Sequence, residues 1–250
     1  MRAPHWLAFY GLVVAGWAGL WLMTAAPAGP GTGPLAALVE LCRAGAARAD
    51  LAILVAMWAL MSAAMMAPTA VPAIATWEDL ARAGAGTRGG FWALIAGYLA
   101  VWLGFSLLAA LAQKGLAALA LIDGAGRAAS PWLTAGLLAF AGAYQFSALK
   151  AACLSACRHP LTFFMEHWRP GPGAALVMGL RLGAVCLGCC WALMLLAFAG
   201  GVTSLAWMGA ATVLMTLEKL PELGRPITAP LGWALLAAAA LVAAGALGAA

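Results

Sequence analysis

Five of the six cysteines sit in two short groups whose spacing suits a helix. Cys186, Cys189 and Cys190 lie in the run C-L-G-C-C, and Cys153 and Cys157 are four residues apart. Residues three or four apart share one face of a helix, so each group can present two or more sulfurs to one ion. Thiolates favour soft metals such as Cu(I), which makes both groups candidate metal ligands. The alternative is that these cysteines are small hydrophobic residues packed between helices.

A third group of sulfurs comes from methionines that recur four residues apart in an apolar segment. They are Met57, Met61, Met65 and, next to the last, Met66. Thioethers also suit Cu(I), so Met61, Met65 and Met66 are candidate exchangeable ligands, although methionine is a common filler of hydrophobic cores. Pro68 and Pro72 follow, and we expect them to interrupt the helix. The backbone carbonyls that they free must then face protein or water.

Glu218 is the remaining candidate ligand, at the end of the apolar segment 203–219. A carboxylate at this position can complete a metal site. It can also pair with one of the cations Lys150, Arg181 and Lys219, which is the simpler interpretation.

Other chemistry is sparse. The histidines lie outside the apolar segments or at their ends, which argues against a haem held by two of them; His159 and His167 remain possible auxiliary ligands. The chain has no phosphate-binding G-x-x-x-x-G-K-[ST] run and no serine nucleophile elbow. We therefore expect neither a nucleotide partner nor a hydrolytic enzyme. Cys42 stands apart from both cysteine groups in a connecting segment.

The composition is that of an integral membrane protein. Apolar residues make up 66% of the chain and charged residues 8%, with a mean hydropathy of +0.98. A soluble domain is typically about 45–50% apolar and about 25% charged. The net charge of +5 therefore bears on orientation in the lipid bilayer and not on nucleic acid, for which no basic stripe is present.

We predict an all-α, polytopic transmembrane bundle that forms a single integral membrane domain over residues 1–250. Gly200-Gly201 should join two of its helices as a tight hairpin, and Gly179 and Gly183 form a small-x-x-x-small surface for close helix packing. The count is seven spans, or six if the first is a cleaved signal peptide. The predicted spans are 5–24, 50–68, 91–112, 131–149, 182–200, 203–219 and 229–249.

The basic residues predict the orientation. With the N-terminus in the cytoplasm, inside segments hold nine Lys and Arg residues and outside segments hold four. Since positive residues are enriched on the cytoplasmic side, we expect a multi-pass protein of the bacterial inner membrane with its C-terminus outside. The same orientation places the sulfur groups and Glu218 at four helix ends in the cytoplasmic third of the bilayer.

Three blocks of the sequence resemble a known family. They are M-W-A-L-M-S-A-A-M-M-A-P-T-A-V-P (57–72), C-L-S-A-C-R-H-P (153–160) and the cysteine-rich segment 181–220, which ends near L-E-K-L. The family is an uncharacterised bacterial one, a domain of unknown function described as predicted metal-binding integral membrane proteins. The resemblance covers residues 50–221 as a metal-binding core. Thr203-Ser204 departs from the family pattern, which often reads Met-Asn there, so one possible methionine ligand is missing.

The resemblance implies metal binding in the membrane, with Cu(I) the expected ion, by residues within the quoted blocks. These are Met61, Met65, Met66, Cys153, Cys157, Cys186, Cys189, Cys190 and Glu218. We expect a role in copper handling or in delivery to a copper chaperone or membrane cuproenzyme, without catalysis. One rival is a membrane thiol–disulfide oxidoreductase, since Cys186 to Cys189 forms a C-x-x-C. Another is a non-catalytic scaffold or assembly subunit in which every sulfur is packing.

Overall fold

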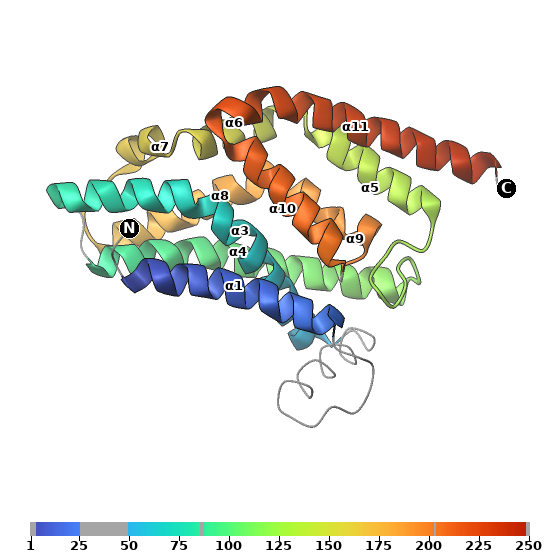
Figure 1. Ribbon diagram of the computed structural model, residues 1–250, viewed down its shortest axis with the longest axis horizontal. Coiled ribbons are helices and arrows are strands. Elements are labelled where there is room, and N and C mark those ends of the chain that lie inside the picture. The colour runs from blue at the N-terminus through green and yellow to red at the C-terminus, as the bar shows by residue number, and fades with distance from the viewer. Residues whose placement is uncertain (1–3, 26–49, 86–87, 203, 249–250) are drawn as a thin grey trace.

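The computed structural model consists of helices and connecting loops and describes residues 4–25, 50–85, 88–202 and 204–248 (Figure 1). No β-strand occurs in these ranges, which confirms the predicted all-α class, and Cys42 lies outside them. The helices are α1 (Pro4–Ala25), α3 (Leu51–Leu80) with the π-helical turn η1 (Ala81–Ala85), α4 (Arg88–Ala118), α5 (Pro131–Tyr144), α6 (Ala148–Arg158), α7 (Pro160–His167), α8 (Pro172–Leu195), α9 (Ala197–Gly200), α10 (Leu205–Lys219) and α11 (Pro221–Gly248).

Four helical segments in the described ranges are long and apolar enough to cross a membrane. They are Leu51–Ala83, Gly89–Ala118, Pro172–Gly200 and Gly224–Gly248. The predicted span 131–149 is instead the bent pair α5 and α6, which meet at 62° and would count as a fifth span if they cross together. The predicted span 203–219 is α10, whose 15 residues are fewer than the roughly 20 needed to cross a bilayer.

Short polar side chains start several of these helices. Asp50 accepts hydrogen bonds from the backbone N–H groups of Ala52 and Ile53, at 3.0 and 3.3 Å, and so caps α3. Ser147 caps α6 in the same way, with its hydroxyl 3.1 Å from the N–H of Lys150. Such side chains satisfy backbone donors that a helix leaves unpaired at its first turn. The cap at Ser147 allows the chain to restart as α6 directly after the bend.

The prediction that Pro68 and Pro72 interrupt the helix is wrong. Helix α3 continues through both prolines to Leu80 and bends along its course (Figure 1). Proline lacks the N–H that would bond the carbonyl four residues earlier, so Pro68 leaves the Ala64 carbonyl free. The indole Nε1–H of Trp17 donates to this carbonyl at 3.0 Å. A neighbouring helix thus satisfies the freed group, and the backbone stays helical.

Helices α4 and α8 pack with their backbones in close approach. A Cβ atom added at Gly179 would overlap the backbone carbonyl of Leu94, and one added at Gly97 would overlap that of Leu176. Gly183 lies against Val101 one turn further along, which confirms the predicted small-x-x-x-small surface of α8. This close pair brings Tyr98 of α4 beside the cysteines of α8.

The chain reverses after α8, as expected for a helix–turn–helix around Gly200-Gly201. Gly201 adopts a positive φ of 97°, and Ser204 then caps α10. Figure 1 shows α10 running back from α9 towards α6. The C-terminal end of α10, with Glu218 and Lys219, thereby returns to the level of the cysteines.

Candidate metal centre

The cysteines of α8 and Met66 of α3 lie near the middle of long helices, whereas Cys153 and Cys157 lie on the short helix α6. Helix α8 begins at Pro172, about four turns before Cys186, and α3 continues from Met66 to Leu80 for about four further turns. The prediction that Cys186, Cys189 and Cys190 lie in the first turns of their helix is therefore wrong, while their predicted position in the cytoplasmic third of a bilayer stays a prediction. The predicted boundaries followed Arg181 and Pro68, but an arginine beside a cavity and a proline with a satisfied carbonyl are both accommodated within a helix.

The two cysteine groups meet across α6 and α8. The Sγ atoms of Cys157 and Cys189 are 3.9 Å apart. Cys153, one turn earlier on α6, lies against Gly188, where an added Cβ would come within 2.6 Å of its sulfur. The Tyr144 hydroxyl donates to the Gly188 carbonyl at the same place. The glycine inside C-L-G-C-C therefore gives α6 the room to approach the cysteines of α8.

A thioether from α3 joins the cysteines of α8 on their other side. The Cys190 Sγ lies 3.6 Å from the Met66 Sδ. Cys186 has two polar neighbours, the Tyr98 hydroxyl at 3.2 Å and the Lys219 Nζ at 3.1 Å. The three cysteines of α8 and Met66 are all almost fully buried. We call Cys157, Cys186, Cys189, Cys190 and Met66 the thiol cluster.

Lys219 places a positive charge at the edge of the thiol cluster. Its ammonium donates to the Thr69 hydroxyl at 2.7 Å as well as to Cys186, and the residue is buried. A buried cation requires an anion or strong acceptors nearby. The carboxylate adjacent in sequence, Glu218, does not supply the charge, because it is bound elsewhere. The Cys186 sulfur and the Thr69 hydroxyl are the acceptors that the geometry offers to this charge.

Glu218 forms a buried ion pair with Lys150. The Lys150 Nζ is 2.8 Å from the Glu218 Oε2, and the two side chains are 1% and 2% exposed. Pairing of this carboxylate with one of the three named cations is thereby confirmed. Its second oxygen, Oε1, is buried without a hydrogen-bond partner. Within residues 4–25, 50–85, 88–202 and 204–248 no sulfur contact of Glu218 is found, so its role as a metal ligand stays a prediction.

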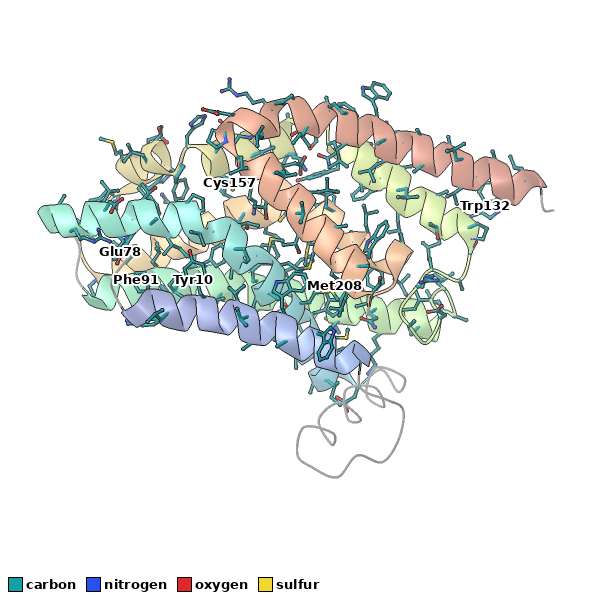
Figure 2. All side chains as sticks on the ribbon, in the orientation of Figure 1. Tyr10, Glu78, Phe91, Trp132, Cys157 and Met208 are labelled. Carbon is teal, nitrogen blue, oxygen red and sulfur yellow. The ribbon has the colours of Figure 1, made fainter. Side chains whose placement is uncertain are left out.

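The remaining predicted ligands face other spaces. Met61 and Met65 line a small cavity between α3, α8 and α10 together with Met194 and Met208. His159 and His167 line a separate cavity of about 520 Å³ between α6, α7 and α8, with Glu166 and Arg181. In Figure 2 several yellow sulfur atoms lie between the labels of Cys157 and Met208.

Within the described part of the chain, no three His, Cys, Asp or Glu side chains are grouped closely enough to hold one ion. The arrangement is instead a pair of thiols with a third thiol and a thioether nearby. Such a set lacks the closed four-ligand shell of a structural zinc site. It suits a soft monovalent ion that binds few sulfur ligands.

Sequence reasoning missed two residues of this region. Tyr98 contacts Cys186 and also donates to the Met66 carbonyl at 3.2 Å. It is one of only three tyrosines in the chain and lies inside an apolar segment, which was a usable signal. Lys219 was considered only as a partner for Glu218, although a lysine at the end of a helix that contacts cysteines could itself have been a candidate.

A comparison with known protein families bears on the function of this region. The family model PpoB2, described as a copper chaperone, matches residues 55–242. The chain belongs to this copper chaperone family. The match includes every residue of the thiol cluster and both cavities described above. Neither the curated proteins nor the solved structures include a match to the chain.

Proposed function

We propose that the protein is a copper chaperone of the bacterial inner membrane that binds Cu(I) and delivers it to a cuproenzyme or another copper carrier. The observation that supports this most is that α8 brings one thiol against a thiol of α6 and the next against a thioether of α3, in a member of a copper chaperone family. No step of the proposed role changes a covalent bond in a substrate. The lipid bilayer is the surrounding partner.

The proposed Cu(I) ligands are Cys157 of α6 and Cys189 of α8, with Cys190 of α8 and Met66 of α3 as the next ligands. Two metal–sulfur bonds of about 2.3 Å in line would separate the sulfurs by about 4.6 Å. The observed 3.9 Å is slightly less, so a bent geometry or a small outward shift of α6 would admit an ion. Cys153 and Cys186 flank this pair and are proposed as alternative ligands during exchange. For Glu218 we propose the ion pair with Lys150 in place of metal ligation.

The charges favour a monovalent ion. A bis-thiolate Cu(I) complex carries one negative charge, and the Lys219 ammonium beside Cys186 would neutralise it. A divalent ion with the same two thiolates would leave the Lys219 charge uncompensated in a buried site, which is unfavourable. The site should therefore prefer Cu(I) over Zn(II).

For the topology, we propose seven membrane crossings with the N-terminus in the cytoplasm. The nine-to-four distribution of basic residues supports this orientation. Helix α1, the bent pair α5 and α6, and α10 would provide the three crossings beyond the four long helices. The short α10 would cross with the extended residues that flank it.

Metal binding by the purified full chain tests this function. We expect the detergent-solubilised protein to retain one or more Cu(I) ions per chain after desalting, measured by elemental analysis. The variant Cys157→Ser with Cys189→Ser should lose the thiol-bound ion, whereas Cys42→Ser should retain it. Thiolate ligation displaces protons, so affinity should fall as the pH is lowered. Retention of copper by the double variant at wild-type affinity would contradict the proposed ligands.

The 3.9 Å contact between Cys157 and Cys189 also suits a second function, thiol–disulfide exchange. Oxidation would join the two sulfurs in a disulfide, release two protons and pass two electrons to an acceptor such as a membrane quinone. Thiol titration with and without reductant separates the two functions. A pair that is reduced as isolated and binds Cu(I) supports the chaperone, and a pair that cycles with a quinone supports the oxidoreductase.

A further inference from the structure

We propose that the protein contains a second soft-cation site, free of thiols, in the cavity lined by Met61, Met65, Met194 and Met208 beside Trp207. This proposal rests on the copper function above and extends it from one binding site to two successive ones. Its ligand class is a monovalent soft cation, Cu(I) or its redox-inert analogue Ag(I). We call these five side chains the methionine site.

The cavity draws its four thioethers from three helices. Met61 and Met65 come from α3, Met194 from α8 and Met208 from α10. All four are between 1% and 3% exposed. The enclosed space is about 10 Å³, close to the smallest space that holds one water-sized particle. Four flexible side chains from three helices therefore converge on a space about the size of a single ion.

The lining carries sulfur and aromatic groups but no charged residue. Thioethers bind soft ions and have little affinity for hard or divalent ones. The face of an indole attracts a cation within about 6 Å of the ring, and tryptophan does so best among the aromatic residues. Trp207 supplies such a ring, and close packing on Gly200 holds it in place. The methionine site would therefore select a monovalent soft ion without contributing an anion.

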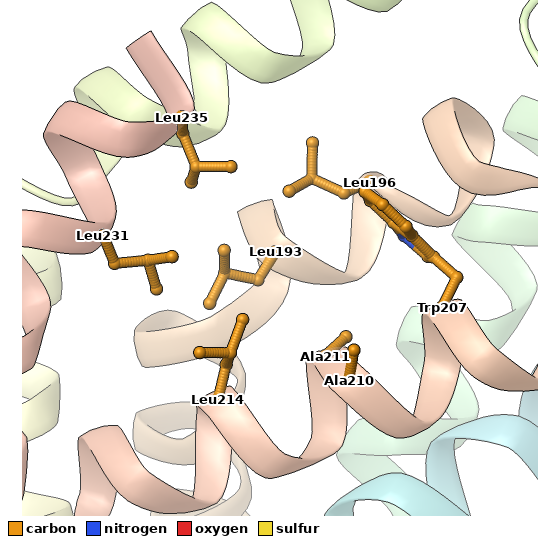
Figure 3. A pocket seen from close by; sticks show the side chains of 8 residues that line it. All are labelled: Leu193, Leu196, Trp207, Ala210, Ala211, Leu214, Leu231 and Leu235. Atoms are coloured by element: carbon orange, nitrogen blue, oxygen red, sulfur yellow. The ribbon is translucent and has the colours of Figure 1, made fainter. Parts of the chain in front are cut away.

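The neighbouring cavity shows what apolar packing alone looks like in this fold. It lies between α8, α10 and α11 and is lined by leucines and alanines with Trp207 (Figure 3). Leu193, Trp207 and Ala211 line both cavities, so a shared wall separates them. A cavity lined only by aliphatic side chains needs no methionine, yet four methionines gather on one side of this wall and none on the other.

The methionine site is continuous with the thiol cluster. Met65 is the neighbour of Met66, whose sulfur is 3.6 Å from Cys190. Met194 follows Cys190 by one helical turn on the same face of α8. An ion that leaves Cys190 and Met66 would therefore meet new thioether ligands within a single turn. The two sites form a short relay along α8, from thiolate ligands to neutral thioether ligands.

The experiment counts ions per chain in the full-length, detergent-solubilised protein. Metal-free protein is titrated with Ag(I), and with Cu(I) kept reduced by ascorbate, and bound metal is measured by elemental analysis. We expect two ions in the wild type and one in Met61→Leu with Met208→Leu. Leucine conserves the volume of methionine, so the fold should persist. Met178→Leu is the matched control, because Met178 is equally buried on α8 but lines neither cavity.

The pH response separates the two sites. Thioethers carry no proton, so the ion of the methionine site should remain bound when the pH is lowered from about 7 to about 5, while the thiol-bound ion is lost. A variant with Ser at Cys157, Cys186, Cys189 and Cys190 should keep one pH-insensitive ion. Replacing Trp207 by Phe should weaken that ion by about 3- to 30-fold.

Each outcome decides between the proposals. One ion in the wild type that the serine variant abolishes would overturn the methionine site and leave the copper function standing. A wild type that binds no Ag(I) or Cu(I) would overturn both. Equal loss of the second ion in Met178→Leu and in the double methionine variant would show that core packing, and not ligation, sets the count.

Discussion

Lys219 is the charged residue that would influence which metal ion the thiol cluster binds. Its ammonium contacts Cys186 and Thr69, and no carboxylate among the described residues pairs with it. The fixed positive charge of Lys219 beside Cys186 would leave the proposed thiolate pair, Cys157 and Cys189, suited to a monovalent ion and not to a divalent one. At an effective dielectric of about 20, a unit charge about 5 Å away is worth about 3 kcal/mol. That energy is enough to decide between ions of different valence.

We expect Lys219→Gln to relax the selectivity of the thiol cluster. Zn(II) binding should rise relative to Cu(I) by at least about tenfold, because the divalent complex would no longer leave an excess charge. Competition between Cu(I) and Zn(II) measured by elemental analysis checks this. Lys219→Arg keeps the charge and should behave as the wild type. An unchanged ratio in the glutamine variant would show that the lysine only fills space.

The pair of Lys150 and Glu218 leads to a prediction about stability. Removing one partner alone, as in Glu218→Gln, should lower the free energy of unfolding by about 3–5 kcal/mol, since a buried charge is left uncompensated. The double variant Lys150→Met with Glu218→Leu should recover most of the loss. Thermal unfolding in detergent provides the measurement. Copper content should stay at the wild-type level in the double variant, and a marked fall would instead make Glu218 a metal ligand.

At the scale of helices, the contact of α4 with α8 positions the cysteines. The backbones approach so closely that a Cβ atom added at Gly179 would overlap the carbonyl of Leu94. Any separation of these helices would move Cys186 away from Tyr98. The small residues of α8 therefore position the candidate site as well as stabilise the fold, because they allow the two backbones to pack closely.

Gly179→Ala should therefore destabilise the protein, by about 1–3 kcal/mol through overpacking. Gly104→Ala on α4 is the control, because a Cβ added there meets no atom within 4 Å. The control should be neutral or slightly stabilising, since alanine favours helix over glycine. Melting temperatures of the two variants in the same detergent give the comparison. Similar losses in both would place the close contact elsewhere.

The spacing of cysteines and methionines was enough to predict that the two cysteine groups meet, but not which methionine joins them or which atoms touch. Helical periodicity placed Cys186, Cys189 and Cys190 on one side of their helix, and Cys189 and Cys190 do contact sulfurs of two other helices. Periodicity contains no information on the rotation of one helix against another. For that reason Met66 contacts Cys190, while Met61 and Met65 face the methionine site.

The helix boundaries were harder to predict from the sequence, for a different reason. Hydropathy ends a predicted span at the first charge or proline, as at Arg181 and Pro68. The chain keeps both within helices, because a cavity receives the arginine and Trp17 bonds the carbonyl that the proline frees. Both compensations come from residues distant in sequence, so local pattern cannot indicate them.

For the whole molecule, the proposed topology makes a prediction of its own. A cysteine introduced near the C-terminus should react with an impermeant thiol reagent from outside the cell, and one introduced at Gly171 should react only after the membrane is broken. Native cysteines stay in place as the background, measured in the parent chain. Labelling of the C-terminal position from the cytoplasm only would contradict seven crossings with an internal N-terminus.

In a membrane, the uncharged lining of the methionine site would also expose the proposed ion to the membrane potential. An ion held by thiolates is neutralised locally, whereas an ion among thioethers keeps its positive charge. Crossing a full potential of 100 mV is worth about 2.3 kcal/mol per charge. The step from Cys190 to Met194 is one turn, about 5.4 Å of a core about 30 Å thick, so it involves only about 0.4 kcal/mol. Binding sites one helical turn apart would thus divide the electrical work of moving a cation into steps comparable to thermal energy.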